Sequence, residues 1–138
     1  IEIVAQKTAE KYERSADLSL DLCQLALRIS EANLKKIVEE LVDNAFKFSA
    51  SGSKVVIKAL HEQDTFKLYI RDYGRGMTPD QIKSLGAYMQ FNRALFEQQG
   101  LGLGLTLAQR LVELHNGKLR IESRSEQGTA VGVELSVY

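Results

Sequence analysis

Short segments in which apolar and polar residues alternate are the feature of this sequence that most limits its fold. Five segments carry the pattern, namely residues 18–22, 55–60, 66–70, 118–123 and 130–137. Such alternation buries one side of each segment and predicts a β-strand. Because most links between strands are too short for a crossover, we expect a largely antiparallel sheet with segments 55–60 and 66–70 paired near its centre.

Three other segments place apolar residues at helical spacing and predict helices over 1–13, 31–48 and 105–115. Ser30 is a candidate N-cap for the second helix, and Asn116 with Gly117 would end the third. The fold class expected is therefore α/β (α+β). We predict a two-layer sandwich in which three helices cover one face of a sheet of about five strands.

Size and composition indicate one domain, residues 1–138, with its own core. Hydrophobic residues make up 44% and charged residues 26% of the chain, as in ordinary globular proteins. Eighteen basic residues balance eighteen acidic ones, which argues against nucleic-acid binding and against direct membrane contact. The single cysteine, Cys23, fits a reducing compartment. We expect a cytoplasmic domain, and a membrane anchor elsewhere in a longer parent protein stays open.

The helix expected over 31–48 has a polar border beside its core face. On a helical wheel the core arc contains Leu34, Ile37, Val38, Leu41, Ala45 and Phe48. Glu40, Asn44 and Lys47 fall within about 60° of one another next to that arc. Two oxygen donors and an ammonium suit Mg²⁺ with an attached phosphate. An ordinary solvated i,i+4 pattern explains the same spacing equally well, so the helix alone leaves both readings open.

A second motif follows the strand expected over 66–70, where Asp72 precedes Gly74 and Gly76. Glycines allow another group to approach the backbone closely. A carboxylate at this strand end could accept a hydrogen bond from the exocyclic amine of adenine and reject guanine, which has a carbonyl there. An ordinary acidic turn is the alternative.

A third motif places Gly100, Gly102 and Gly104 directly before a predicted helix. Backbone amides at a helix start can hold phosphate oxygens. The spacing differs from the dinucleotide-binding fingerprint, and the lysine of a P-loop is missing. Both common nucleotide-binding folds are therefore disfavoured.

The ordered set of motifs resembles the ATP-binding boxes of the superfamily that contains gyrase, heat-shock chaperones, histidine kinases and mismatch-repair proteins. The matching segments are 40–48, 72–76, 100–105 and 128–129. Segment 102–117 is similar to sensor histidine kinases in particular. The resemblance covers nearly the whole chain and implies ATP and Mg²⁺ as cofactors.

The resemblance also implies individual roles. Asn44 would bind Mg²⁺, Glu40 would occupy the neighbouring metal or water-facing position, and both would be catalytic. Lys47 would meet the phosphates. Asp72 would hold the adenine amine, supported by Thr129 through a water.

The remaining nucleotide contacts implied by the resemblance come from the pocket floor and from a lid. Gly74 and Gly76 would floor the adenine pocket. Residues 77–101 would form a mobile ATP lid, in which Phe91 and Arg93 resemble a phenylalanine box without its usual proline. The phosphates would be enclosed by Gly102, Gly104 and Leu105, and further contacts would come from Phe48, Met77, Gly100, Leu101 and Leu103.

The function implied is that of the ATP-binding catalytic domain of a two-component sensor histidine kinase. Such a domain presents the γ-phosphate of ATP to a histidine on a dimerisation domain, from which a response-regulator receiver domain takes it. That phosphoacceptor motif is missing here, since His61 lies in a predicted turn and His115 at a predicted helix end. We therefore expect no autophosphorylation by the chain alone.

Two alternatives stay open at this point. One is a serine kinase of the anti-sigma type, which shares the fold, although segment 102–117 argues against it. The other is an interaction module in which ATP orders the lid without phosphotransfer.

Overall fold

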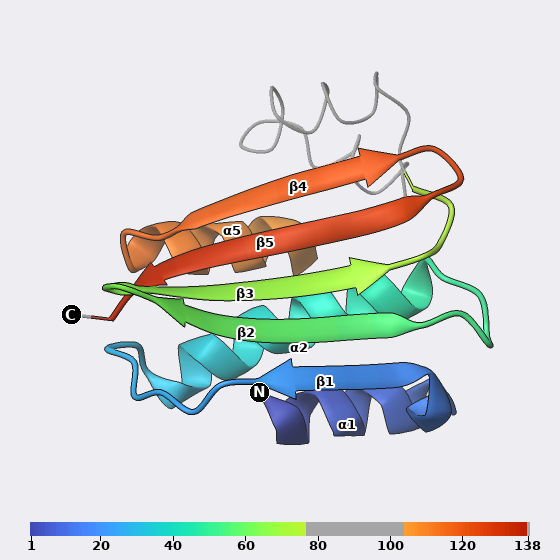
Figure 1. Ribbon diagram of the computed structural model, residues 1–138, viewed down its shortest axis with the longest axis horizontal. Helices are drawn as coiled ribbons and strands as arrows, with labels where there is room; N and C mark the ends of the chain where they lie inside the picture. The colour runs from blue at the N-terminus through green and yellow to red at the C-terminus, as the bar shows by residue number, and fades with distance from the viewer. Residues whose placement is uncertain (77–103, 138) are drawn as a thin grey trace.

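The computed structural model describes residues 1–76 and 104–137 (Figure 1). Within these ranges each α-helix precedes one or two strands in the sequence. The elements are α1 (Glu2–Lys11), the 3-10 turn η1 (Ser15–Asp17), β1 (Leu18–Leu22), α2 (Glu31–Lys47), β2 (Val55–Glu62), β3 (Thr65–Asp72), α5 (Gly104–Leu114), β4 (Lys118–Arg124) and β5 (Gly128–Ser136).

The strands form one mixed sheet with the order β1-β2-β3-β5-β4. Three of its pairs are antiparallel, and β1 pairs with β2 in parallel. The parallel pair is possible because α2 lies between these strands in the sequence and provides the crossover. The expected mostly antiparallel sheet with β2 and β3 in its interior is confirmed.

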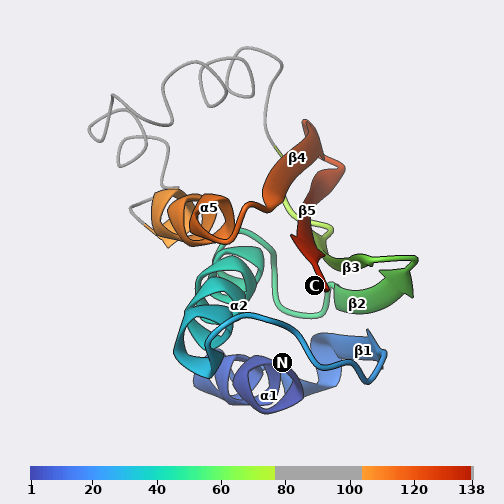
Figure 2. The ribbon, with the colours of Figure 1, turned by 90° about the vertical axis from the view of Figure 1, so that its left-hand side faces the viewer.

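The three helices cover one face of the sheet, as the sequence predicted (Figure 2). The core face of α2 was predicted too narrowly, because Val42 and Phe46 are also buried while Leu34 and Phe48 are only partly buried. Phe46 stacks on Tyr12, with 5.7 Å between ring centroids. Because α1 covers a second side of α2, the buried arc is wider than a stripe that faces the sheet alone.

The predicted ends of two helices are confirmed. The Ser30 hydroxyl accepts a hydrogen bond of 3.1 Å from the backbone N–H of Asn33. Past the end of α5, Asn116 has a φ of 56°, and the N–H of Gly117 donates to the Val112 carbonyl at 2.9 Å. None of the helices in the two described ranges is both long and apolar enough to cross a bilayer.

The turn between β2 and β3 is shorter than predicted. His61 and Glu62 belong to β2 and pair with Phe66 and Thr65 of β3. The turn itself is Gln63–Asp64, and Gln63 has a left-handed φ of 53°. Such a two-residue turn suits the twist of the strands, so their ladder extends to its edge.

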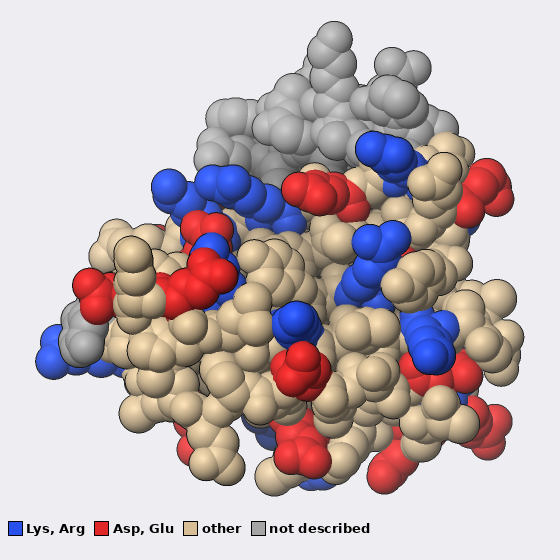
Figure 3. Space-filling model, in the orientation of Figure 1, with Lys and Arg blue, Asp and Glu red and all other residues tan. Residues whose placement is uncertain are grey.

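None of the described helices lies over the opposite face of the sheet (Figure 2). Figure 3 shows this face with basic and acidic side chains interspersed. The exposed residues of β2, β3 and β4 include Lys58, Arg71, Arg120 and Glu122. Mixed signs give this face no broad field of one charge, in line with the balanced composition.

Candidate functional site

Asp72 is a buried carboxylate at the last position of β3, only 6% exposed. Its Oδ1 accepts a hydrogen bond of 2.9 Å from the Gly74 N–H, and the backbone of Thr129 also bonds to the carboxylate. Burial raises the pKa of Asp72, while these two hydrogen bonds and the charges of Arg71 and Arg14 oppose the rise. The carboxylate is therefore held in place by backbone groups but is incompletely compensated for its loss of water.

Three glycines let the backbone close around Asp72. A Cβ on Gly74 would collide with the carbonyl oxygen of Phe48, and a Cβ on Gly128 would collide with that of Asp72. Gly76 and Gly128 also have left-handed φ values of 64° and 91°. These positions need glycine for space and, at two of them, for backbone conformation. Of the predicted floor of the pocket, Gly74 thus lies beside Asp72, and Gly76 lies against the carbonyls of Arg124 and Gly128.

Phe48 ends α2 next to this floor. The guanidinium of Arg75 lies 4.7 Å from the centroid of its ring, and the ammonium of Lys47 lies 5.5 Å from the same centroid. The cationic groups of Arg75 and Lys47 therefore both contact the Phe48 ring, which lies at the end of α2. Lys47 is exposed, so its ammonium is accessible to a solvent-borne anion.

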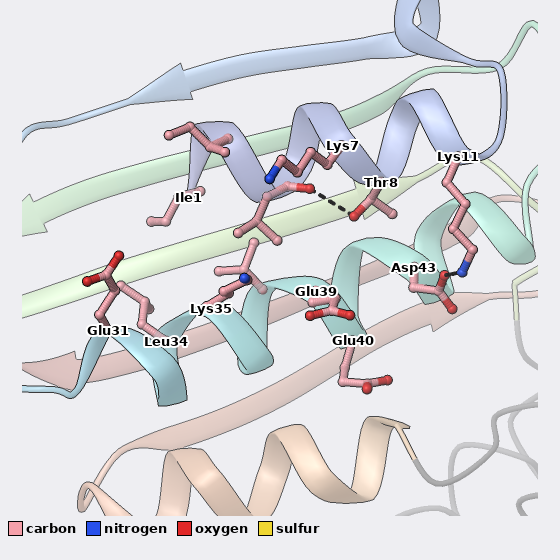
Figure 4. Close-up of a pocket in the computed structure, with 13 residues that line it drawn as sticks. Ile1, Lys7, Thr8, Lys11, Glu31, Leu34, Lys35, Glu39, Glu40 and Asp43 are labelled. Atoms are coloured by element: carbon pink, nitrogen blue, oxygen red, sulfur yellow. Dashed lines mark hydrogen bonds and ion pairs between the residues drawn. The ribbon is translucent and has the colours of Figure 1, made fainter.

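Glu40 and Asn44 lie one turn apart on α2, and both are partly buried. Figure 4 shows that Glu40 extends toward α5. Its Oε1 lies 2.8 Å from the ammonium of Lys36, and a Cβ on Gly104 would collide with its Oε2. The hydrogen bond from Lys36 to Glu40 raises the pKa of Lys36. The Glu40 carboxylate is thus paired with Lys36 and lies against Gly104, the first residue of α5.

Oxygen donors for Mg²⁺ are present on this side of α2. The residues described contain no cluster of three or more histidine, cysteine or acidic side chains that could hold a metal alone. Mg²⁺ is often held by one or two protein ligands together with substrate phosphates and water. The amide of Asn44 and the carboxylate of Glu40 fit such an incomplete ligand set.

The start of α5 contributes backbone rather than side chains. Leu105 is 3% exposed and belongs to the core, so its side chain cannot cover a phosphate. Its amide lies in the first turn of α5, where amides have no partner within the helix.

Thr129 lies opposite Asp72 in the pairing of β3 with β5. Its hydroxyl lies 2.8 Å from the Ser123 hydroxyl. The link to Asp72 that the structure describes runs through the Thr129 backbone, while the water-mediated link stays a prediction.

Several predicted contacts lie outside the described residues. They are Met77, Phe91, Arg93, Gly100, Leu101, Gly102 and Leu103, together with the lid segment 77–101. The roles assigned to them stay predictions.

A hollow that is lined in part by Glu40 lies between α1 and α2 (Figure 4). Residues from the first eleven positions and from α2 line it, and Asp72 does not. At one end Asp43 accepts hydrogen bonds from Lys11 at 3.0 Å and from the hydroxyl of Tyr12 at 2.8 Å. Asp43 therefore connects α2 to α1. Its side chain points toward α1, whereas that of Glu40 points toward α5 (Figure 4).

Sequence reasoning missed Arg14, which is buried although it follows the end of α1 in a polar turn. Its guanidinium donates to backbone carbonyls of the segment that follows α2, including those of Ser49 and Ala50 at 3.0 and 2.7 Å. This segment begins at Phe48, so Arg14 lies behind one wall of the site.

Comparison with known proteins identifies the family. The profile of the histidine kinase-, DNA gyrase B- and HSP90-like ATPases matches residues 29–138. The histidine protein kinase DivJ of Caulobacter vibrioides is 39% identical over 105 residues, which cover 75% of this chain and 18% of that protein. The sensor protein DegM of a Bacillus species is 31% identical over 138 residues, 99% of this chain and 36% of that protein. The chain thus spans about a third or less of these relatives.

Solved structures agree with this assignment. The mycobacterial sensor histidine kinase MprB superposes with a TM-score of 0.72 at 25% identity, covering 98% of this chain and 94% of that one. The catalytic domain of the histidine kinase ThkA superposes with a TM-score of 0.77 at 18% identity, covering 99% and 92%, which supports the fold. The resemblance noted in the sequence is confirmed. This chain belongs to the histidine kinase-, DNA gyrase B- and HSP90-like ATPase family, and it is a histidine kinase-type ATP-binding domain.

Proposed function

We propose that this chain binds Mg-ATP and presents its γ-phosphate to a histidine on a separate dimerisation domain, from which a receiver domain takes the phosphoryl group. The buried, incompletely compensated carboxylate of Asp72 is the observation that carries the proposal. A carboxylate held in place by backbone N–H groups still has lone pairs for an external donor. The exocyclic amine of adenine is such a donor.

Asp72 would select adenine by hydrogen bonding. The amine of adenine donates to the carboxylate and offsets the cost of burying its charge. Guanine would place a carbonyl oxygen against the same carboxylate, leaving two acceptors face to face. A buried site of this kind rejects the wrong partner strongly because its polar group is left unpaired.

The phosphates would extend from Asp72 along the polar side of α2 toward the start of α5. Lys47 would neutralise phosphate charge, and the first amides of α5 would donate to phosphate oxygens. Asn44 would hold Mg²⁺, which supplies charge neutralisation when it is bound with the nucleotide, and Glu40 would occupy the neighbouring metal or water-facing position. The contribution of the chain to catalysis is then positioning and electrostatic stabilisation, while the attacking nitrogen comes from the partner domain.

Calorimetric titration tests the binding step. We expect the chain to bind ATP with Mg²⁺, to bind ATP more weakly without Mg²⁺, and not to bind GTP. The variant Asp72→Asn should lose ATP binding, because an amide can turn a donor toward the adenine amine. Asp64→Asn is a matched control, since Asp64 is exposed next to the opposite end of β3. Equal ATP binding by Asp72→Asn and wild type would refute the proposed adenine contact.

A phosphotransfer assay tests the reaction itself. The chain is mixed with ATP labelled at the γ-phosphate and with the dimerisation domain of a histidine kinase. We expect an acid-labile phosphohistidine on the partner and no label on the chain alone. An acid-stable phosphoserine would support the serine-kinase alternative instead. ATP binding with no transfer to any histidine-bearing partner would favour the nucleotide-gated module.

Glu40 is assigned a role in turnover rather than in affinity. Glu40→Ala should leave the dissociation constant for ATP nearly unchanged and slow phosphotransfer. Glu39→Ala is the control, because Glu39 is the exposed neighbour on the same helix. Equal losses of affinity and rate in Glu40→Ala would count against this role.

A further inference from the structure

Arg14 is connected to the chain through all three nitrogens of its guanidinium. Nε pairs with Asp17 Oδ2 at 2.7 Å. Nη1 donates to the carbonyls of Phe46 and Ser49, each at 3.0 Å, and Nη2 donates to those of Ala50 and Ser53 at 2.7 and 2.9 Å. One side chain thus donates to four backbone carbonyls at and after the end of α2, where the last carbonyls of a helix lack the partners that a further turn would supply.

These four carbonyls belong to segment 46–53, which turns the chain from α2 into β2. The same segment is also bound by the carboxylate that pairs with Arg14, because the Gly52 N–H donates to Asp17 Oδ2 at 2.9 Å. The Arg14 guanidinium also lies 5.0 Å from the centroid of the Phe46 ring. Arg14 and Asp17 therefore fix the conformation of this segment, whose other hydrogen bonds join residues only three or four positions apart.

Segment 46–53 in turn forms a wall of the site around Asp72. Its Phe48 carbonyl lies so close to Gly74 that no Cβ fits between them. The Phe48 ring lies against Arg75, and the Gly74 N–H holds Asp72 Oδ1. A movement of the segment would displace the Gly74 amide and with it the orientation of the Asp72 carboxylate.

From this chain of contacts we infer that Arg14 is a positioning residue for nucleotide binding, which acts through segment 46–53 on Gly74 and Asp72. The inference rests on the proposed ATP site. The guanidinium is needed as well as the charge, because its planar donors reach several carbonyls at once. A lysine has one ammonium, which cannot serve both the Phe46–Ser49 carbonyls and the Ala50–Ser53 carbonyls. Arg14→Lys should therefore keep a positive charge and lose the fixed geometry.

The test compares ATP affinity in folded variants. Dissociation constants are measured by calorimetry for wild type, Arg14→Lys and Arg28→Lys at a temperature where circular dichroism shows each to be folded. Arg28 is exposed before α2 and serves as the control. We expect Arg14→Lys to weaken ATP binding about 3- to 30-fold, the range of mutations that act through intervening contacts. Arg28→Lys should bind as wild type does.

Amide hydrogen exchange gives a second readout that a general loss of stability would not reproduce. In folded Arg14→Lys the Gly74 amide should exchange faster than in wild type, while amides in the middle of β3 keep their protection. If Arg14→Lys does not fold, Asp17→Asn replaces it, because this variant weakens the hold on Arg14 and Gly52 and should reduce ATP affinity in the same direction.

Each outcome separates the inference from the proposed function. Weaker ATP binding with faster Gly74 exchange supports the positioning role. A folded Arg14→Lys, or Asp17→Asn in its place, with unchanged ATP affinity overturns the inference and leaves the proposed function standing. Failure of wild type itself to bind ATP overturns both.

Discussion

Arg14 and Asp72 are the two buried charged residues in the described part of the chain, and both are 6% exposed. Arg14 has acceptors for each nitrogen of its guanidinium and a carboxylate partner. Asp72 is hydrogen-bonded by backbone N–H groups, and burial still raises its pKa. The two side chains are therefore equally buried but differ in how far their charges are paired. A fully paired charge holds structure together, whereas an incompletely compensated one is suited to receive a ligand.

Removal of the fully paired charge should have the largest effect on stability. Arg14→Met removes the guanidinium bonds to four carbonyls and the cation that pairs with the partly buried Asp17, so we expect a loss of about 3–5 kcal/mol in the free energy of unfolding. Urea denaturation measures this loss, with Arg28→Met as the exposed control. A loss no greater than that of the control would show that the contacts of Arg14 contribute little.

Two glycines with similar backbone angles allow the regions near Asp72 and Arg14 to be compared. Gly128 has a φ of 91° and Gly52 a φ of 92°, but only at Gly128 would a Cβ meet other atoms. Gly52→Ala should cost about 1–2 kcal/mol of left-handed strain. Gly128→Ala should cost about 1–3 kcal/mol more, because it forces atoms into an occupied space. Denaturation and ATP titration of both variants check this. Only Gly128→Ala should also weaken ATP binding, and equal effects would contradict the close approach to Asp72.

Tyr12 shows that a raised pKa does not by itself mark a ligand site. Burial, followed by the hydrogen bond to Asp43 and its charge, raises the pKa of Tyr12 to about 12. The folded state thus holds this proton more tightly, so its stabilising contribution is complete below about pH 10 and is lost as the pH rises toward 12. Tyr12→Phe should cost about 1 kcal/mol at neutral pH. In an absorbance titration it should remove a phenol that ionises near pH 12, and an unchanged amplitude at that pH would contradict the contact.

Asp72→Asn should change the stability of the nucleotide-free chain least. The raised pKa of Asp72 means that the folded state binds its proton more tightly than the unfolded state. The wild type therefore loses stability relative to Asp72→Asn as the pH rises from about 3.9 through the folded-state pKa. Denaturation at several pH values measures the difference. A variant that is less stable than wild type at neutral pH would show that the carboxylate is fully compensated.

The strands and helices could be predicted because their signals are local. Alternation identified all five strands, and Ser30 marked the start of α2 through a hydrogen bond to a residue three positions away. The parallel pairing of β1 was not stated, since it depends on where α2 returns the chain. The width of the buried arc of α2 was underestimated for the same reason, because Phe46 is covered by Tyr12 from another helix.

Site residues could be predicted where the interacting groups are neighbours in the sequence, and could not be predicted where they are far apart in it. Asp72 and the nearby glycines could be found because a carboxylate and small residues at a strand end form a compact motif. Arg14 could not be found, because its acceptors lie more than thirty positions further along the chain. In the sequence it resembles any exposed basic residue in a turn. The ion pair of Glu40 with Lys36 was within reach, since i,i+4 spacing is visible on a helical wheel.

Thermal unfolding of wild type and Asp72→Asn, each with and without saturating Mg-ATP, tests whether the buried carboxylate serves the nucleotide. Without nucleotide we expect Asp72→Asn to melt at the same temperature as wild type or higher. With nucleotide at about 100 times its dissociation constant, wild type should gain about 2.7 kcal/mol and the variant nothing. An equal gain in both proteins would contradict the claim that the buried carboxylate of Asp72 is kept for the nucleotide.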